Sequence, residues 1–380
     1  MSESTPDHFK AMPSSATQFE DILQLTKKIA TDNFLPIANV VDQSPIPPVA
    51  NIRLLADNGL LGLSTPKECG GIGAPPAIIR NYTEILAAAC GTTTFIQGQH
   101  QSGCTLISNG RNDALKAELL PLFASGHRIL GVAFAHVRRP GPPMLRVSEV
   151  EGGYIFDGSA AWFTGWGVMT DVLMAGTLPN GDFVYVVIEL LQGDALVASA
   201  PMKLASMNAS GTVSLQCKSL FVPRHRTVKV ISPENMSASD SLAVLSVTSQ
   251  IFGVTEASLS LLREIFSRRE TPEIGSVIIA IEQELATARS RVDYWRNATE
   301  MEDYYQRALD VRAACIEMGV RSAQAALTAS GGSANQLDHS AQRLFREAMF
   351  YTLTAQTNDV RSATLNRLAE SARAAAKREM

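Results

Sequence analysis

The chain has 380 residues, of which 46% are hydrophobic, so it is long enough for two or three globular domains and a sizeable core. Its 33 basic and 37 acidic residues give a net charge of −4, and no basic stripe is interleaved with aromatic residues, which argues against a nucleic-acid partner. The five cysteines are widely spaced and odd in number, so they indicate neither a disulfide framework nor a zinc site.

The N-terminal stretch MSESTPDHFKAMPSS is polar and lacks the profile of a signal peptide. No segment approaches about 18 uninterrupted apolar residues, so no membrane span is expected. No HExxH pattern indicates a metal site, and no GxGxxG follows a predicted strand. These features predict a cytoplasmic protein without a bound metal or a Rossmann nucleotide site.

The first part of the chain, residues 1–127, has helical periodicity. Apolar residues recur at spacings of three and four in FEDILQLTKKIATDNFLPIANVV, NYTEILAAAC and NDALKAELLPLFASG. The turn signals STPKECGGIGAPP and SNGRN separate these segments. The pattern predicts an N-terminal α-helical domain.

The period changes in residues 128–232. Six short segments rich in Val, Ile and Phe alternate with turns such as PGPP, EGG, PNGD and NASG, which is typical of strands and tight turns. The segments are ILGVAFAHV, GYIFDGSAAWF, DVLMAGTL, DFVYVVIEL, TVSLQCKSLFV and TVKVIS. This pattern predicts a small middle β domain, either a barrel or a sandwich.

Residues 233–380 return to helical periodicity after PENMSASDS, which we interpret as a cap and linker with Asp240 as a helix N-cap. Four long helical segments follow, with ASGGSANQ as the main break, and four such helices form a bundle. The fold class is therefore α+β: a helical domain, a small β domain and a C-terminal helical bundle.

The stretch AAWFTGWG, residues 160–167, contains two of the three tryptophans. A Trp can anchor a core when its ring is buried and its N–H finds a partner. Alternatively, aromatic rings can flank a flat ligand. The sequence pattern by itself leaves both interpretations open.

Four segments in this order resemble motifs of the acyl-CoA dehydrogenase family. STPKECGGIGAPP resembles its glycine-rich turn, DGSAAWFT its "G-x-K-x-W-(I/F)-T" element, and NASGTVSLQCKSLFVP its exit from the β domain. ASGGSANQ followed by QRLFREA resembles its late glycine turn and following helix. The resemblance extends over about residues 20 to 365.

The resemblance implies FAD bound between the β domain and the bundle, with the adenosine end reaching a neighbouring subunit of a homodimer or homotetramer. The implied substrate is an acyl thioester, on CoA or on an acyl-carrier protein, with an electron-transfer partner or oxygen as acceptor. The flavin-side residues that it implies are Trp162, Phe163 and Thr164 together with Phe134, Ala135 and His136. Those implied for the pyrophosphate and adenosine are Arg269, Gly331, Gly332 and Ser333. Trp166 has no implied role, and we expect it to pack in the core.

The resemblance fails at the catalytic base. Most members of the family have a glutamate where this chain has Ala355, and a smaller set has it where this chain has Ala243. The catalytic residues are therefore unknown from sequence; Asp240 and His136 are the weak candidates. Glu256 and Glu347 are interpreted as surface or structural charges.

Three functions remain open. The first is oxidation of the α,β bond of an acyl thioester with a displaced base. The second is a flavin monooxygenase of the same fold, which needs no carboxylate and could use His136 or His100. The third is a catalytically degenerate flavin-binding or structural subunit.

Overall fold

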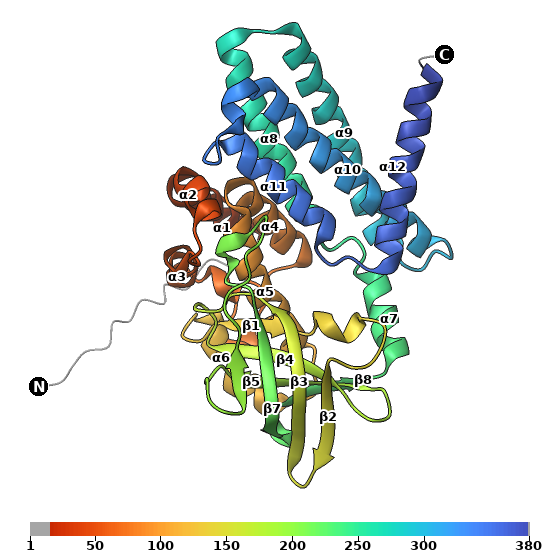
Figure 1. Ribbon diagram of the computed structural model, residues 1–380. Coiled ribbons are helices and arrows are strands. Elements are labelled where there is room, and N and C mark those ends of the chain that lie inside the picture. The colour runs from red at the N-terminus through yellow and green to blue at the C-terminus, as the bar shows by residue number, and fades with distance from the viewer. Residues whose placement is uncertain (1–15, 379–380) are drawn as a thin grey trace, which may run out of the picture.

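The computed structural model describes residues 16–378, in which a helical N-terminal part, a central sheet and a C-terminal set of helices follow one another (Figure 1). The predicted α+β class is therefore confirmed. The polar N-terminal residues 1–15 lie outside the described residues. No helix among those described is both long and apolar enough to span a bilayer. Within the same range, no group of three His, Cys, Asp or Glu side chains is arranged to hold a metal ion.

The N-terminal part consists of six helices around α5, which is largely buried. The single helix predicted over residues 19–41 is interrupted by a π turn at Ala30–Phe34 and a 3₁₀ turn at Leu35–Ile37. Pro36 explains the interruption, because a proline removes a helix hydrogen bond. The helices are α1 (Ala16–Ile29), α2 (Ala38–Gln43), α3 (Val49–Asp57), α4 (Pro76–Ala89), α5 (Gly91–Ser108) and α6 (Asp113–Ala124).

The central domain is one mixed eight-stranded sheet with strand order β6-β7-β3-β2-β4-β5-β8, and β1 pairs with β4. All six predicted strand segments form strands, and two further strands were not predicted: β2, which is largely exposed and polar, and β6, which has only three residues. The strands are β1 (Leu130–Ala133), β2 (Leu145–Val150), β3 (Gly153–Phe163), β4 (Asp171–Thr177), β5 (Phe183–Glu189), β6 (Leu196–Ala198), β7 (Val213–Pro223) and β8 (Thr227–Ile231).

The C-terminal part contains the four predicted bundle helices and two more. The segment interpreted as a linker is helix α7, whose N-cap is Ser232; Asp240 lies near its C-terminal end, so the N-cap prediction was wrong. Helix α12 diverges from the bundle (Figure 1). The helices are α7 (Pro233–Leu242), α8 (Thr248–Arg269), α9 (Pro272–Arg296), α10 (Tyr304–Ser330), α11 (Ser340–Leu353) and α12 (Asn358–Arg378).

Helix α11 fastens the N-terminal helices to the bundle through a buried ion pair. Arg343 Nη1 lies 3.0 Å from Glu347 Oε1, and the same oxygen accepts a 3.0 Å hydrogen bond from the Gly91 N–H at the start of α5. A Cβ on Gly91 would lie 2.7 Å from the Glu347 side chain, so only glycine allows this approach. Glu347 is 2% exposed and is a structural charge, as the sequence indicated.

Candidate active site between the sheet and the bundle

The end of strand β3 presents a strained tryptophan. Trp162 has φ +65° and is 48% exposed, whereas the next residue, Phe163, is fully buried and contacts Trp166 edge-on with ring centroids 6.5 Å apart. A left-handed backbone costs a non-glycine residue roughly 1–2 kcal/mol. The half-exposed indole is thus held away from the core at an energetic cost, while Trp166 packs against the core as expected.

Behind Trp162 lies a chain of buried hydroxyl groups. Thr164 is 2% exposed, and its Oγ1 lies 3.1 Å from Thr212 Oγ1, which in turn lies 2.7 Å from the Ser210 hydroxyl. Each hydroxyl has one donor and two acceptor positions, so this pairing leaves Thr164 capacity for a further bond. The hydroxyl of Thr164, which is predicted to contact a flavin ring, is therefore paired with Thr212, and Thr212 is in turn paired with Ser210.

The segment after β1 turns its side chains into the sheet domain. The Phe134 ring packs 5.6 Å from the Tyr185 ring and beneath the Arg138 guanidinium, so the side chain itself is occupied. His136 is 3% exposed, and its Nε2 lies 2.9 Å from the Ala175 carbonyl oxygen. Burial lowers the pKa of His136 to about 4. The Phe134 and His136 side chains are therefore occupied, whereas the exposed Ala135 and the backbone of this segment remain available to a ligand.

Both histidines proposed for proton transfer are structural. The fully buried His100 accepts a 3.0 Å hydrogen bond from the Leu130 N–H through Nδ1, and burial lowers its pKa to about 4. A buried neutral imidazole that is already engaged with the backbone cannot exchange protons with a ligand in a cleft. The burial of both rings argues against the predicted catalytic use of His136 or His100, which stays a prediction, since the Nδ1 atom of His136 forms no hydrogen bond with a described residue.

The segments that contain Ala243 and Ala355, the two alternative positions of the glutamate in the resemblance, are both bound by the guanidinium of Arg312. Arg312, which is 1% exposed, donates from Nη1 to the Val244 carbonyl (2.9 Å) and from Nη2 to the Thr354 carbonyl (2.8 Å). Val244 follows Ala243, and Thr354 precedes Ala355, so one side chain ties the two segments together. Burial lowers the pKa of Arg312 to about 10. No sequence motif pointed to this arginine.

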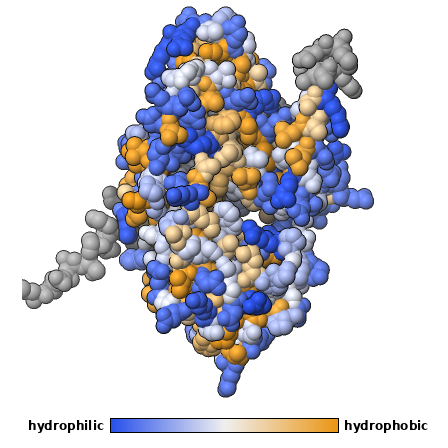
Figure 2. All heavy atoms as spheres, viewed as in Figure 1, coloured by the Kyte–Doolittle hydropathy of each residue, from blue (hydrophilic) through white to orange (hydrophobic). Residues whose placement is uncertain are grey.

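Ala355 is also strained, with φ +48°, and both it and Ala243 are exposed. Two of the five described non-glycine residues with positive φ, Trp162 and Ala355, are thus positions at which the sequence predicted flavin or base chemistry. Weakly polar and hydrophobic residues run down the centre of one face where the bundle meets the sheet domain (Figure 2).

Two carboxylates lie close in sequence to these alanines: Asp240 precedes Ala243, and Asp359 follows Ala355. Asp240 forms a bidentate ion pair with Arg138, with N–O distances of 2.7 and 2.8 Å, so its charge is neutralised. Asp359, at the start of α12, accepts a 2.6 Å hydrogen bond from the Tyr305 hydroxyl. Burial and the adjacent Asp359 raise the pKa of Tyr305 to about 12. Sequence reasoning missed Asp359 because it lies four residues beyond the motif position.

The other predicted cofactor residues lie at the opposite end of the bundle. Arg269 and Ser333 line one pocket of about 350 Å³, and Gly331 and Gly332 adjoin it with nothing within 4 Å of where a Cβ would lie. Helix α8 has 22 residues and ends at Arg269, so it separates the two ends by roughly 33 Å at 1.5 Å per residue. Within one chain, the Trp162 group and the Arg269 group are separate.

The chain is similar to proteins of one family along its length. The family model described as "Acyl-CoA dehydrogenase, N-terminal domain" matches residues 17–127. The chain is 25% identical to mitochondrial isovaleryl-CoA dehydrogenase of Arabidopsis thaliana over 93% of its own length and 92% of the relative. It is 26% identical to 3-sulfinopropanoyl-CoA desulfinase of Variovorax paradoxus over 42% of this chain and 41% of that protein. The structure of butyryl-CoA dehydrogenase from Megasphaera elsdenii superposes with a TM-score of 0.80 at 17% identity, covering 94% of this chain and all (100%) of the other.

Proposed function

The chain belongs to the acyl-CoA dehydrogenase family, and on this premise we propose that it is an FAD-dependent oxidoreductase acting on the α,β bond of an acyl thioester. The observation that carries the proposal is Trp162, a strained and half-exposed indole two residues before Thr164, whose buried hydroxyl is paired with Thr212. Strained residues persist where the surrounding structure enforces them, often at functional sites. An apolar ring beside an oriented hydroxyl suits one face and one edge of a flat heterocycle.

The residues present fit the two ends of FAD. At the far end of the bundle, the exposed Arg269 offers a cation and the Gly331–Gly332 turn offers open backbone, which is the chemistry that a pyrophosphate needs. Because this end lies roughly 33 Å along α8 from the Ala243 side, we propose that one FAD is held by Trp162, Phe163 and Thr164 of one copy and by Arg269 and Ser333 of another. A homodimer is then the smallest complete unit.

When bound, the flavin supplies the acceptor for the β-hydride. The chain itself must orient the thioester, exclude water and remove the α-proton. A positioned general base typically contributes 10²–10⁴-fold, and the alanines at 243 and 355 provide none. Asp359 is the carboxylate that the contacts leave for this role, because Asp240 is neutralised by Arg138 whereas Asp359 is only hydrogen-bonded by Tyr305.

A second candidate function follows from the same two alanines. When the substituent of an acyl thioester is replaced by hydrogen, with water supplying that hydrogen and its hydroxyl ending on the departing group, no α-proton is lost overall, so such a reaction can proceed without the carboxylate that desaturation requires. One relative is named a desulfinase rather than a dehydrogenase. A flavin monooxygenase is less well supported, because the two histidines on which it depended are buried and neutral.

Spectroscopy of the purified protein tests these proposals. We expect a yellow protein whose flavin absorbance is bleached anaerobically by acyl-CoAs or by acyl-carrier-protein thioesters, with an enoyl product. Reoxidation is then followed with an electron-transfer protein and with oxygen separately, which identifies the acceptor. A colourless protein that takes up no FAD would support a degenerate subunit. A flavin that stays oxidised while the thioester loses a substituent would support the second candidate.

The base is tested by comparing Asp359→Asn with Asp240→Asn. We expect Asp359→Asn to slow bleaching and α-proton exchange about 100-fold, and Asp240→Asn to change them little. Equal rates in wild type and Asp359→Asn would remove Asp359 from the mechanism without affecting the proposed use of FAD.

A further inference from the structure

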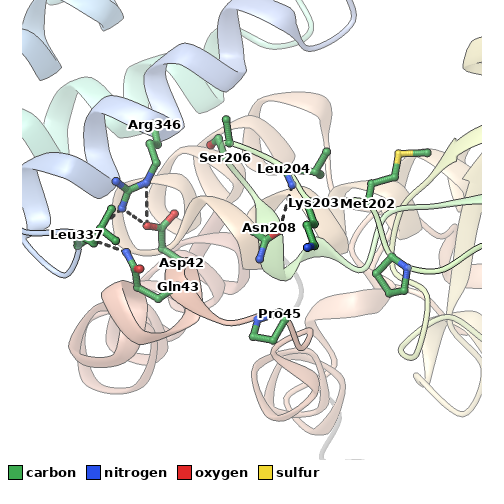
Figure 3. A pocket seen from close by; sticks show the side chains of 12 residues that line it. Asp42, Gln43, Pro45, Met202, Lys203, Leu204, Ser206, Asn208, Leu337 and Arg346 are labelled. Carbon is green, nitrogen blue, oxygen red and sulfur yellow. Dashed lines mark hydrogen bonds and ion pairs between the residues drawn. The ribbon is translucent and has the colours of Figure 1, made fainter.

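A second hollow lies where all three parts of the chain meet, and none of the residues assigned to the flavin lines it. It has a volume of about 560 Å³ and is formed by the end of α2, the loop between β6 and β7, and α11 with the residues before it. Asp42, Gln43, Leu337 and Arg346 lie on one side, and Ser206, Lys203 and Asn208 face them across the opening (Figure 3). Its size falls within the range of small-molecule sites, roughly 300–1,000 Å³.

The wall of this junction pocket contains a buried polar group without a partner. Ser206 lines the pocket and is 6% exposed, and its hydroxyl forms no hydrogen bond with any described residue. A buried hydroxyl is normally paired, and an unpaired one costs free energy. The adjacent Met207 has φ +56° and is fully buried, packed against the bundle beside Thr92. The fold thus holds Ser206 in place by an enforced backbone geometry, and its hydroxyl at the pocket wall lacks a hydrogen-bond partner.

The charges of the junction pocket favour an anion. The Arg346 guanidinium is already used: Nε donates to Asp42 Oδ2 (3.1 Å), Nη2 to Asp42 and the Leu337 carbonyl, and Nη1 to Gln342. Arg346 and Asp42 therefore neutralise each other. Lys203 is exposed at the pocket and pairs with no carboxylate in residues 16–378, so one positive charge remains.

The remaining wall is apolar. Half of the lining residues have no polar side-chain atom other than a thioether: Pro45, Pro201, Met202, Leu204, Ala205 and Leu337. Leu337 is 67% exposed, so covering it with a hydrocarbon group would remove apolar surface from water. An apolar wall with a free hydroxyl and an unpaired cation is complementary to a molecule with a hydrocarbon body and an acidic end.

We propose that the junction pocket binds a small amphipathic carboxylate, with its carboxylate between the Ser206 hydroxyl and the Lys203 ammonium and its hydrocarbon against Leu204 and Leu337. This site is separate from the proposed flavin reaction and does not depend on it. Because the pocket is built from three parts of the chain, its ligand bridges them. A ligand that binds only the folded arrangement raises the stability of the protein in proportion to its occupancy.

Calorimetric titration of the full-length protein with decanoate tests the proposal, with decanamide as a neutral probe of the same length. We expect decanoate to bind in a one-to-one ratio per chain and to raise the melting temperature, and decanamide to bind more weakly. Ser206→Ala should weaken decanoate binding about tenfold, since it removes a hydrogen bond to a charged group. Lys203→Met should weaken it about threefold at low salt, because this cation is exposed.

The controls are Lys218→Met, on the exposed side of β7, and Ser290→Ala, on the exposed surface of α9; both should bind decanoate as wild type does. Ligand-free melting curves establish that each variant is folded. The proposal is overturned if wild type does not bind decanoate, or if decanamide binds equally well. It is also overturned if the two pocket variants retain wild-type affinity, since decanoate would then be bound elsewhere, for example between the sheet and the bundle.

Discussion

The two sides of the region between the sheet and the bundle differ in what the sequence has kept. On the sheet side, Trp162 and Thr164 match the family pattern, and the backbone strain at Trp162 remains. On the bundle side, Ala243 and Ala355 have no acidic group, yet Arg312 still ties their segments together. The scaffold of a site can therefore be maintained after its usual proton acceptor is gone, because backbone contacts hold the position and only the side chain supplies the chemistry.

Restoring a carboxylate on the bundle side should have the largest effect. We expect Ala355→Glu, introduced into Asp359→Asn so that no other proposed base acts, to increase the rate of α-proton exchange of a bound acyl-CoA by about 10²–10⁴-fold, since that is the typical contribution of a positioned base. The left-handed φ at Ala355 should cost glutamate no more than it costs alanine. Exchange is measured by mass spectrometry in deuterated buffer, anaerobically.

The matched control is Ala280→Glu, at an exposed position of α9. It adds the same charge away from the region and should leave the exchange rate unchanged. If α-proton exchange is no faster in Ala355→Glu than in this control, the sheet side and the bundle side do not form one site for the thioester.

Replacing Arg312, which holds the two segments together, should have the next largest effect, a loss of stability. Arg312→Met leaves the buried carbonyl oxygen of Val244 and the partly buried one of Thr354 without their donor. Each such loss costs about 1–3 kcal/mol, so we expect the free energy of unfolding to fall by about 3 kcal/mol in urea titrations. Arg312→Lys should recover part of it, because an ammonium group can still donate to one of the two oxygens.

Combining Arg312→Met with Ala355→Glu tests whether Arg312 positions the segment that contains residue 355. If Arg312 positions the segment, the gain in proton exchange should be smaller in the double variant than in Ala355→Glu alone, at a temperature where both are folded. An unchanged gain together with a loss of stability would make Arg312 a structural residue only.

The fold could be predicted from sequence to a greater extent than the site. The apolar pattern located the buried strands, among them β4 and β5, which are buried on both faces, and the long bundle helices. It missed β2, which is polar, and α12, whose apolar residues Leu365 and Leu368 are exposed. The contacts of Arg312 and Asp359 were not predictable, since they join residues that are 42 to 68 and 54 positions apart with no local motif.

The burial of His100 and His136 likewise could not be seen in the sequence, because a lone histidine has no pattern that reveals which way its ring faces. It has a measurable consequence at low pH. With folded-state pKa values of about 4 against 6.5, the unfolded chain binds protons between these values and the folded protein does not. Stability is therefore complete above pH 6.5 and is lost as the pH falls toward 4.

For His100, the expected loss between pH 7 and pH 5 is about 2 kcal/mol of unfolding free energy. His100→Asn can keep an acceptor for the Leu130 N–H but cannot titrate, so it should flatten the pH dependence by this amount. His127→Asn, at an exposed position, should leave it unchanged. A wild-type pH dependence retained in His100→Asn would mean that the ring is solvated in solution. The buried contact between His100 on α5 and Leu130 at the start of β1 would then be absent in solution.

The smallest effect is expected for the one ion pair that joins the turn after β1 to α7, between the two sides. Arg138 and Asp240 are 33% and 25% exposed in their side chains, so solvent screens them, but their geometry is bidentate. A double-mutant cycle with Arg138→Met and Asp240→Asn should give a coupling of about 1 kcal/mol at low salt, and less at about 1 M, where the Debye length is about 3 Å.

The exposed pair Arg307–Asp303, which lies within a single helical turn, serves as the reference and should give about 0.3–0.5 kcal/mol. A coupling for Arg138–Asp240 no larger than this reference would mean that the pair adds nothing beyond a surface contact. The pair would then contribute nothing to holding α7 against the turn after β1. A larger coupling would instead explain why Asp240, although close to Ala243 in sequence, does not replace the missing base: its charge is already used to hold the two sides together.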